Sequence, residues 1–298
     1  MIIRQRLTFL ICFAVLGLLS FANASTGDRL PEFKQCVEVC QHENCDNGFG
    51  GATKIPLLHR LLFWTCPAEC DYTCQHIITN ARVKSGQPIV QFHGKWPFYR
   101  FLGMQEPFSV FFSLLNFLAH QNGLAKITAQ IPETYSMRKY YVMLSYAGMI
   151  SWVASMVFHT RDYPVTEQLD YFAAGGSVLY GMYYTPIRIF RMDRGGKRAS
   201  SVLRAWTLLC ILFYTAHVVY LKWWDWDYTY NMAANVVVGV LQNSLWSWFS
   251  FEKYRKSKRA WTALPGLWHL GTVAPTMIFY SFLLKDAQDD IAGQRLKA

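Results

Sequence analysis

Three side chains in one apolar stretch of the sequence are suited to acid–base chemistry. Ser155 supplies a hydroxyl, His159 an imidazole and Asp170 a carboxylate. Ser155 and His159 are four residues apart, so on a helix they share one face. Asp170 follows His159 by eleven residues, at the start of the next apolar run. Ionisable groups within apolar runs are costly to place in lipid and therefore indicate function, and these three groups can converge at one depth of a membrane.

Each of these residues also has a purely structural interpretation. His159 could be an interfacial histidine that caps its helix, and Ser155 a small residue that lets two helices approach each other. His120 is predicted to snorkel to the membrane surface, and Glu106 to be a carboxylate favoured by the dipole at a helix N-terminus. His217 is predicted to belong to a structural hydrogen-bonding cluster with Asp225, Asp227, Asn231 and Asn235.

The elements that position these residues are long apolar segments. Hydrophobic residues make up 52% of the 298 residues and charged residues only 16%, against about 25% charged in soluble domains. This composition, with 11 Trp, 17 Tyr and 21 Phe, excludes a disordered or collagen-like chain. Six segments approach the length of about 20 residues that a membrane-spanning helix needs: Pro107 to Leu124, Tyr140 to Phe158, Leu169 to Ile189, Val202 to Leu221, Tyr230 to Phe251, and Trp261 to Leu284.

The connections between these segments alternate in charge. Those after the first, third and fifth segments carry three, six and five basic residues, whereas those after the second and fourth carry one each, Arg161 and Lys222. By the positive-inside rule the three basic connections are cytosolic. The positive-inside arrangement of the connections therefore explains the net charge of +10, and we expect no nucleic-acid partner.

The N-terminal quarter of the chain is predicted to lie in the secretory lumen. Residues 1–24 have the basic start, short apolar run and Ala-Asn-Ala end of a signal peptide, although a short membrane anchor is the alternative. Six of the eight cysteines follow as two triplets, which predicts three disulfides in an oxidising compartment with fifteen possible pairings. Zinc bound by cysteines with His42, His59 or His76 is the rival interpretation. The two triplets are Cys36, Cys40 and Cys45, and Cys66, Cys70 and Cys74.

Several segments resemble a known family in the order in which that family has them. The pattern of Ser155, His159 and Asp170 is similar to the signature of the CREST superfamily of membrane hydrolases. The luminal cysteines and further motifs more narrowly resemble the Per-like family, which remodels the lipid of GPI anchors. Those motifs are Gln91 to Phe98, Gln105-Glu106-Pro107, Phe158 to Asp162, Asp227-Tyr228 with Asn231 to Asn235, and Leu267-Trp268-His269.

The resemblance implies a fold, an activity and a place. The fold is an all-α polytopic membrane bundle, and the activity is a phospholipase A2-type hydrolysis of the sn-2 acyl ester of the GPI inositol phospholipid on GPI-anchored proteins. It acts in the endoplasmic reticulum membrane of fungi or the Golgi membrane of animals. Zn²⁺ held by three histidines activates a water, with His159 and His269 as ligands, Asp170 as general base and Ser155 as a donor to the metal site or the oxyanion.

One departure from the family pattern affects this implied site. The position four before His269 is Pro265, where the family has its first histidine of a pair. Six alternating spans also make the last helix run outward from the cytosol, which leaves His269 about 12 Å from its cytosolic start, with most of the roughly 30 Å core between it and the luminal side of His159 and Asp170. The family has seven spans, so we expect that about one helix plus a loop is missing between Gly266 and Leu267, through a gene-model error or alternative splicing. Otherwise His217 could substitute as a ligand, or the product could be inactive.

The expected organisation is a signal peptide (1–24), a luminal cysteine-rich segment (25–98) and a transmembrane hydrolase domain (99–298). A second interpretation of the chain is a non-catalytic membrane receptor, or a chaperone for luminal clients. The cluster of Ser155, His159 and Asp170 favours the enzyme, whereas Pro265 favours the alternative.

Overall fold

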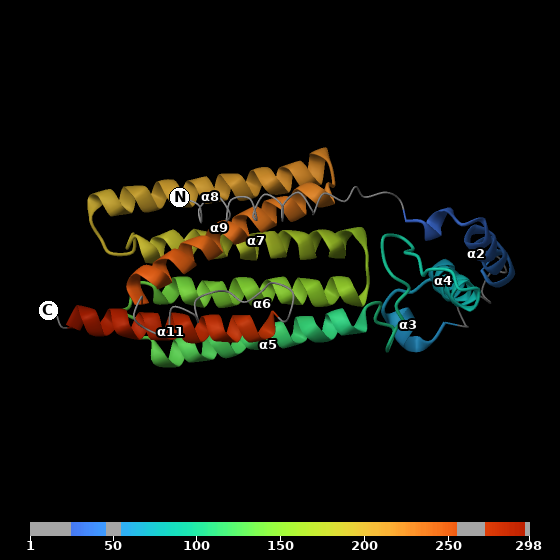
Figure 1. Cartoon of the computed structure of the whole chain (residues 1–298), viewed down its shortest axis with the longest axis horizontal. Coiled ribbons are helices and arrows are strands. Elements are labelled where there is room, and N and C mark those ends of the chain that lie inside the picture. The colour runs from blue at the N-terminus through green and yellow to red at the C-terminus, as the bar shows by residue number, and fades with distance from the viewer. Residues whose placement is uncertain (1–24, 46–54, 255–271, 296–298) are drawn as a thin grey trace. The chain divides into compact units, whose positions relative to one another are not determined.

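The computed structural model describes residues 25–45, 55–254 and 272–295. The predicted signal peptide, Pro265 and His269 lie outside these residues. The described chain is built of helices, with only isolated β-bridges between them (Figure 1). The predicted all-α class is therefore confirmed. The chain divides into two compact units, one made of Met1–Phe108 with His159–Asp162, and the other of Ser109–Phe158 with Tyr163–Ala298.

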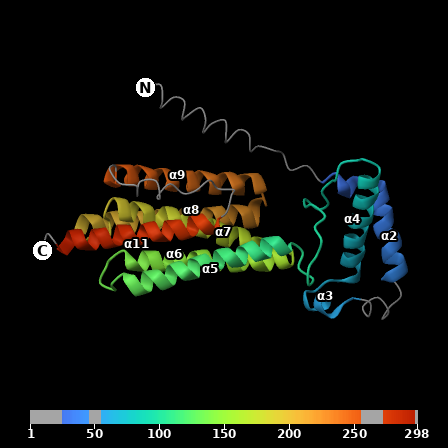
Figure 2. The same cartoon turned by 60° about the horizontal axis from the view of Figure 1, so that its bottom comes forward.

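The first unit, which we call the luminal unit, is organised by a pair of disulfide-linked helices. Helix α2 (Pro31–Asn44) lies against α4 (Cys66–Lys84), and η1 (Gly27–Arg29) and α3 (Leu57–Leu61) complete the unit. Three disulfides join α2 with its C-cap to α4. From one disulfide to the next, the residue number of the cysteine increases along α2 and that of its partner decreases along α4. The two helices are therefore antiparallel (Figure 2). The bonds are Cys36–Cys74, Cys40–Cys70 and Cys45–Cys66.

These bonds decide between the two predictions for the cysteines. Cys45, Cys66 and Cys70 have sulfur atoms within 4.8 Å of one another, as a metal site would require. All three sulfurs are nevertheless consumed in disulfides. The disulfide prediction is confirmed, and the described structure supports no cysteine-bound zinc in this unit.

Two tight turns shape the segment that leads from α4 to the bundle. Bridges join Phe92 to Lys95 and Phe101 to Met104. The central residues of both turns have positive φ angles: 49° and 78° at His93 and Gly94, and 52° and 80° at Leu102 and Gly103. Positive φ at both central positions is the geometry of a type I′ turn, and glycine adopts it without steric cost. The two turns fix the course of residues 92–104.

The second unit, which we call the bundle, contains the long helices. They are α5 (Pro107–Gln130), α6 (Arg138–Thr160), α7 (Pro164–Ile189), α8 (Lys197–Val219) with the π turn η4 (Tyr220–Trp224), α9 (Tyr228–Tyr254) and α11 (Val273–Arg295). Five of them cover the first five apolar segments predicted from the sequence. The described part of the sixth begins later than predicted and runs past Leu284. By length and hydropathy, two stretches qualify as membrane spans, Arg138–Thr160 and Lys197–Trp224.

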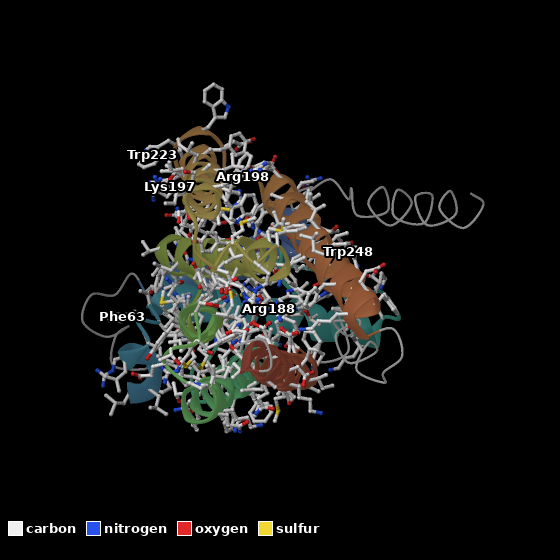
Figure 3. All side chains as sticks on the ribbon, turned by 90° about the vertical axis from the view of Figure 1, so that its left-hand side faces the viewer. Phe63, Arg188, Lys197, Arg198, Trp223 and Trp248 are labelled. Carbon is white, nitrogen blue, oxygen red and sulfur yellow. A yellow bond between two sulfur atoms is a disulfide. The ribbon has the colours of Figure 1, made fainter. Side chains whose placement is uncertain are left out.

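Aromatic side chains fill the centre of the bundle. Tyr141, Tyr184, Trp246 and Leu283 are at most 1% exposed and belong to one contiguous core. Arg188 is also buried among the helices (Figure 3), where its Nε lies 2.7 Å from Oδ2 of Asp286. A buried charge is stable only when it is paired in this way. The ion pair therefore fixes the position of α11 against α7.

Helix α11 runs parallel to α9, which contradicts the direction predicted from six alternating spans. Trp246 on α9 packs against Phe279 and Phe282 on α11, with ring centroids 5.6 and 5.7 Å apart. Further along both helices, Lys253 Nζ lies 2.7 Å from Asp286 Oδ1. Contacts that advance together along two helices require parallel axes. The last helix therefore shares the direction of α9 rather than reversing it.

Candidate active site

Ser155 and Asp170 line the same cavity inside the bundle. The cavity has a volume of about 490 Å³, and Ser155 comes from α6 whereas Asp170 comes from the second turn of α7. Helix α7 can begin just before Asp170 because Pro164 occupies its first position, where no backbone N–H is needed, and Tyr163 and Thr166 form a capping box. The structure thus brings together two of the three side chains singled out by their spacing.

The Ser155 hydroxyl takes part in a buried hydrogen bond. Its Oγ lies 3.0 Å from Oγ of Ser113 on α5, and both side chains are less than 9% exposed. A serine pair lets α5 and α6 approach closely, as the structural interpretation of Ser155 requires. Ser155 also presents its hydroxyl group at the wall of a cavity that contains a carboxylate.

The remaining cavity wall is apolar with polar groups set into it. Leu144, Val178 and Phe279 supply apolar surface, and Gln242 and Asn243 of α9 with Thr272 supply polar atoms. Sites for amphipathic ligands combine an apolar lining with a few placed polar groups. This cavity can hold a hydrocarbon chain that carries one polar, reactive group.

His120 lies at this cavity as well, so the prediction that it snorkels to the membrane surface is wrong. Its Nδ1 is 2.8 Å from the Tyr280 hydroxyl on α11. Space for the ring exists because residue 148 is glycine: a Cβ there would lie 2.2 Å from the imidazole. Sequence spacing missed this because the signal was a glycine on a neighbouring helix.

His159 is held by a carboxylate. Its Nδ1 lies 2.9 Å from Oε2 of Glu106, and two backbone bonds fix the approach, from Gln105 N to Thr160 O and from Glu106 N to His159 O, both 3.0 Å. Because the carboxylate accepts, Nδ1 carries the hydrogen and Nε2 is the lone-pair nitrogen of the neutral ring. A histidine that ligates a metal usually has a carboxylate partner of this kind.

Glu106 is also bound by Lys95. The ammonium of Lys95 lies 2.6 Å from Oε1 of Glu106 and 2.9 Å from Oδ2 of Asp162. Burial alone would raise the pKa of Glu106, but the hydrogen bonds from His159 and Lys95 outweigh it and lower the pKa to about 2. Glu106 is therefore a permanent anion at any physiological pH, and not merely a helix-terminal carboxylate.

Three of the motifs noted in the sequence meet at this ion cluster. Lys95 belongs to the segment Gln91 to Phe98, Glu106 to Gln105-Glu106-Pro107, and His159 with Asp162 to the segment Phe158 to Asp162. Reasoning from the residues missed the cluster because its members are far apart in sequence. The available signal was the recurrence of charged residues in three short motifs.

The described residues do not assemble a zinc site. Within them, the cysteine group now known to be disulfide-bonded is the one set of three His, Cys, Asp or Glu donors close enough to share an ion. His217, considered as a substitute ligand, has its Nδ1 3.3 Å from the hydroxyl of Tyr230, a residue that the predicted structural cluster did not include. His159 has the orientation of a ligand but lacks described co-ligands, so no chemical step is assigned to a metal.

Comparison with known proteins gives consistent relatives. The model of the Per1-like family matches residues 56–267. The protein PER1 homolog of Schizosaccharomyces pombe is 36% identical, over 98% of this chain and 96% of its own. The GPI-specific phospholipase A2-like PGAP3 of Bos taurus is 34% identical over 91% and 92%, and protein PER1 of Saccharomyces cerevisiae is 33% identical over 89% and 93%. No solved structure matches.

The relatives contain positions that this chain lacks. The alignment with the S. pombe protein extends over 325 positions, although it includes only 98% of 298 residues. About 30 of its positions therefore have no counterpart here. The alignment with the Bos taurus protein, 301 positions for 91% of this chain, leaves about 30 as well. A length of about 30 residues is that of one membrane-spanning helix with a loop.

Proposed function

Since the chain belongs to the Per1-like family, we propose that it remodels the lipid of GPI anchors by hydrolysing the sn-2 acyl ester of their inositol phospholipid. The observation that carries this proposal is the apolar cavity shared by Ser155 and Asp170. The printed name of several relatives, GPI-specific phospholipase A2-like, supports the same chemistry.

In the proposed reaction Asp170 is the general base. It takes a proton from a water, whose oxygen attacks the ester carbonyl. When the acyl–oxygen bond breaks, Asp170 returns this proton to the departing sn-2 oxygen, which gives a fatty acid and a lysophospholipid anchor. The hydroxyl of Ser155, which lines the cavity and is hydrogen-bonded to Ser113, donates a hydrogen bond to the oxyanion that forms on the carbonyl. The apolar wall holds the acyl chain and excludes bulk water from the ester.

Zinc enters the proposal only through the family resemblance. His159 and His269 would hold the ion, which would supply an activated water. The hydrogen bond between His159 Nδ1 and the Glu106 carboxylate supports His159 as a metal ligand. Metal analysis of the purified protein tests the assignment: His159→Ala should release bound zinc, whereas His76→Ala, which changes a histidine of the luminal unit stacked on Tyr99, should keep it.

The proposed location is a membrane of the secretory pathway, with GPI-anchored proteins as the substrates. It would be the endoplasmic reticulum in a fungus, or the Golgi in an animal. Three disulfides support an oxidising lumen on the side of the luminal unit, and the helices of Arg138–Thr160 and Lys197–Trp224 support membrane insertion.

Complementation tests the activity. A yeast strain deficient in anchor remodelling should regain normal anchor fatty acids with the wild-type chain, and Asp170→Asn should give a loss of at least 100-fold in remodelled anchors, the scale of a general base. Ser177→Ala is the matched control, because Ser177 lines the same cavity on the same helix. Equal rescue by Asp170→Asn and wild type would contradict the proposal and favour a non-catalytic role.

A further inference from the structure

A second cavity lies entirely within the luminal unit. It has a volume of about 470 Å³, within the range of small-molecule sites. Its walls come from α2, residues 64–65, α4, the first type I′ turn, several residues between 96 and 106, and the segment 161–162. We call it the luminal cleft, and neither the proposed hydrolysis nor the family resemblance assigns it a role.

Aromatic rings form one part of its wall. Trp64, Tyr72, Phe92, Trp96 and Phe98 all line the cleft. Trp64 is buried and donates from Nε1 to Gly103 O at 2.8 Å, so it belongs to the scaffold. Trp96 differs because it is 49% exposed while lining the cleft. An indole left open to water at a cleft wall offers a flat apolar face to a ligand.

Polar groups form the rest of the wall, and most are already ordered by the protein. Asp71 binds His93 at 2.8 Å and Gln75 at 2.5 Å. Arg100 and Arg161 have their guanidinium carbons 3.2 and 3.6 Å from the centre of the Trp64 ring. Two groups so close to one ring centre must lie on its opposite faces. Fixed carboxylate, amide and guanidinium groups can hydrogen-bond several hydroxyls or a phosphate in defined directions.

A flat aromatic face beside ordered polar groups suits a sugar ring. Pyranose rings have apolar C–H faces that stack on indole and an edge of hydroxyls that both donate and accept hydrogen bonds. A purely apolar ligand would remove water from the polar side chains of Asp71, Gln75 and Gln105. A small anion would meet carboxylates as well as cations, since Asp71, Glu106 and Asp162 line the cleft together with Lys95, Arg100 and Arg161. The lining therefore favours a glycan that carries a phosphodiester over a lipid tail or a free anion.

We propose that the luminal cleft binds the glycan headgroup of the GPI anchor, with Trp96 stacked on a sugar ring. This inference rests on the proposed function. An sn-2 acyl ester is common to all glycerophospholipids, so a hydrolase specific for GPI has to recognise the part of the anchor that lies in water. The cleft belongs to the unit predicted to be luminal, where that headgroup is.

Binding to the purified full-length protein in detergent tests the proposal. The probe is the water-soluble mannosyl-glucosaminyl-inositol phosphate released from GPI anchors, measured by calorimetry, with inositol 1-phosphate and inorganic phosphate as separate arms. Trp96→Ala should weaken headgroup binding at least tenfold, and Trp96→Phe should retain most of it. Trp224→Ala is the matched control, because Trp224 is an exposed tryptophan of the bundle, 85% accessible. This variant should bind the headgroup as tightly as the wild type does.

Each outcome bears on the proposal. It is overturned by wild-type protein that does not bind the headgroup, by equal affinity in wild type and Trp96→Ala, or by inorganic phosphate binding as tightly as the headgroup. A kinetic arm separates it from the hydrolase proposal: Trp96→Ala should raise KM for a GPI-anchored protein without lowering kcat. A chain that binds the headgroup through Trp96 but hydrolyses nothing would contradict the proposed function and support this inference.

Discussion

Glu106 illustrates how a residue acquires a role that its sequence position does not show. Its place before the proline that opens α5 indicated a carboxylate at a helix terminus. Its partners, Lys95 and His159, are eleven and fifty-three residues away. The spacing of four residues could relate Ser155 to His159 because a helix has a fixed period. No such period relates Glu106 to Lys95, which precedes it across a tight turn, or to His159, which follows it after the helices α5 and α6.

Replacing Glu106 by Gln should destabilise the luminal unit in a pH-dependent way. The pKa of Glu106 is lowered from 4.5 to about 2, so its charge stabilises the fold above about pH 4.5, and this contribution is lost as the pH falls towards 2. The shift corresponds to at most about 3 kcal/mol. Thermal unfolding should show a lower Tm for Glu106→Gln than for wild type at pH 7.

The same measurement at pH 2.5 should show a much smaller difference, because wild-type Glu106 then begins to be protonated. Glu133→Gln is the control, since the Glu133 side chain is 86% exposed in its ion pair with Arg138 and exposed pairs contribute little. A Tm difference for Glu106→Gln that stays constant from pH 7 to pH 2.5 would show that the carboxylate acts through packing rather than charge.

At the scale of elements, the six luminal cysteines show what spacing can and cannot establish. Steps of four residues between Cys36 and Cys40, and between Cys70 and Cys74, fit one face of each of two helices. The direction of α4 relative to α2 depends on the residues that connect the two helices, so the pairing of the cysteines could not be predicted from their spacing. Antiparallel packing places the first cysteine of one helix opposite the last of the other.

Removing the central disulfide should loosen α2 from α4 without unfolding the bundle. A disulfide that closes a loop of this length stabilises by about 2–4 kcal/mol, so Cys40→Ser with Cys70→Ser should increase the rate of protease cleavage within residues 25–108. Cys210→Ser is the control, because Cys210 is an unpaired cysteine in α8. Peptide mapping without reduction should still find Cys36–Cys74 and Cys45–Cys66; shuffled pairs would contradict the ladder.

For the whole molecule, composition was enough to predict helices, and the lengths of the apolar runs were enough to predict five of them closely. Alternation could not predict the direction of α11, because it assumes that each span reverses the one before it. The contacts of Trp246 and Lys253 show that α9 and α11 are parallel. Because α9 ends at Tyr254 and α11 begins at Val273, 18 residues separate them, fewer than the roughly 20 that a membrane-spanning helix needs.

The parallel helices predict the side of the membrane on which the C-terminus lies. Six alternating spans after a luminal N-terminus would return it to the lumen. In the structure, Asp286 binds Arg188 and Lys253, and Asp290 binds Arg191 and Arg194, residues that lie in or next to connections predicted to be cytosolic. The end of α11 therefore lies at the end of the bundle that is predicted to be cytosolic, as a seventh crossing between α9 and α11 would require.

A C-terminal tag containing an N-glycosylation site distinguishes the two arrangements in sealed microsomes. The tag should be removed by added protease and remain unglycosylated, while the same site placed after Ser25 should be glycosylated and protected. Sequencing the transcript between the codons for Tyr254 and Thr272 should reveal a form that encodes about 30 more residues, the number by which the alignments with the relatives exceed the matched part of this chain. A glycosylated C-terminal tag, together with a transcript that has no longer form, would show that the last helix reverses and that the parallel arrangement is wrong.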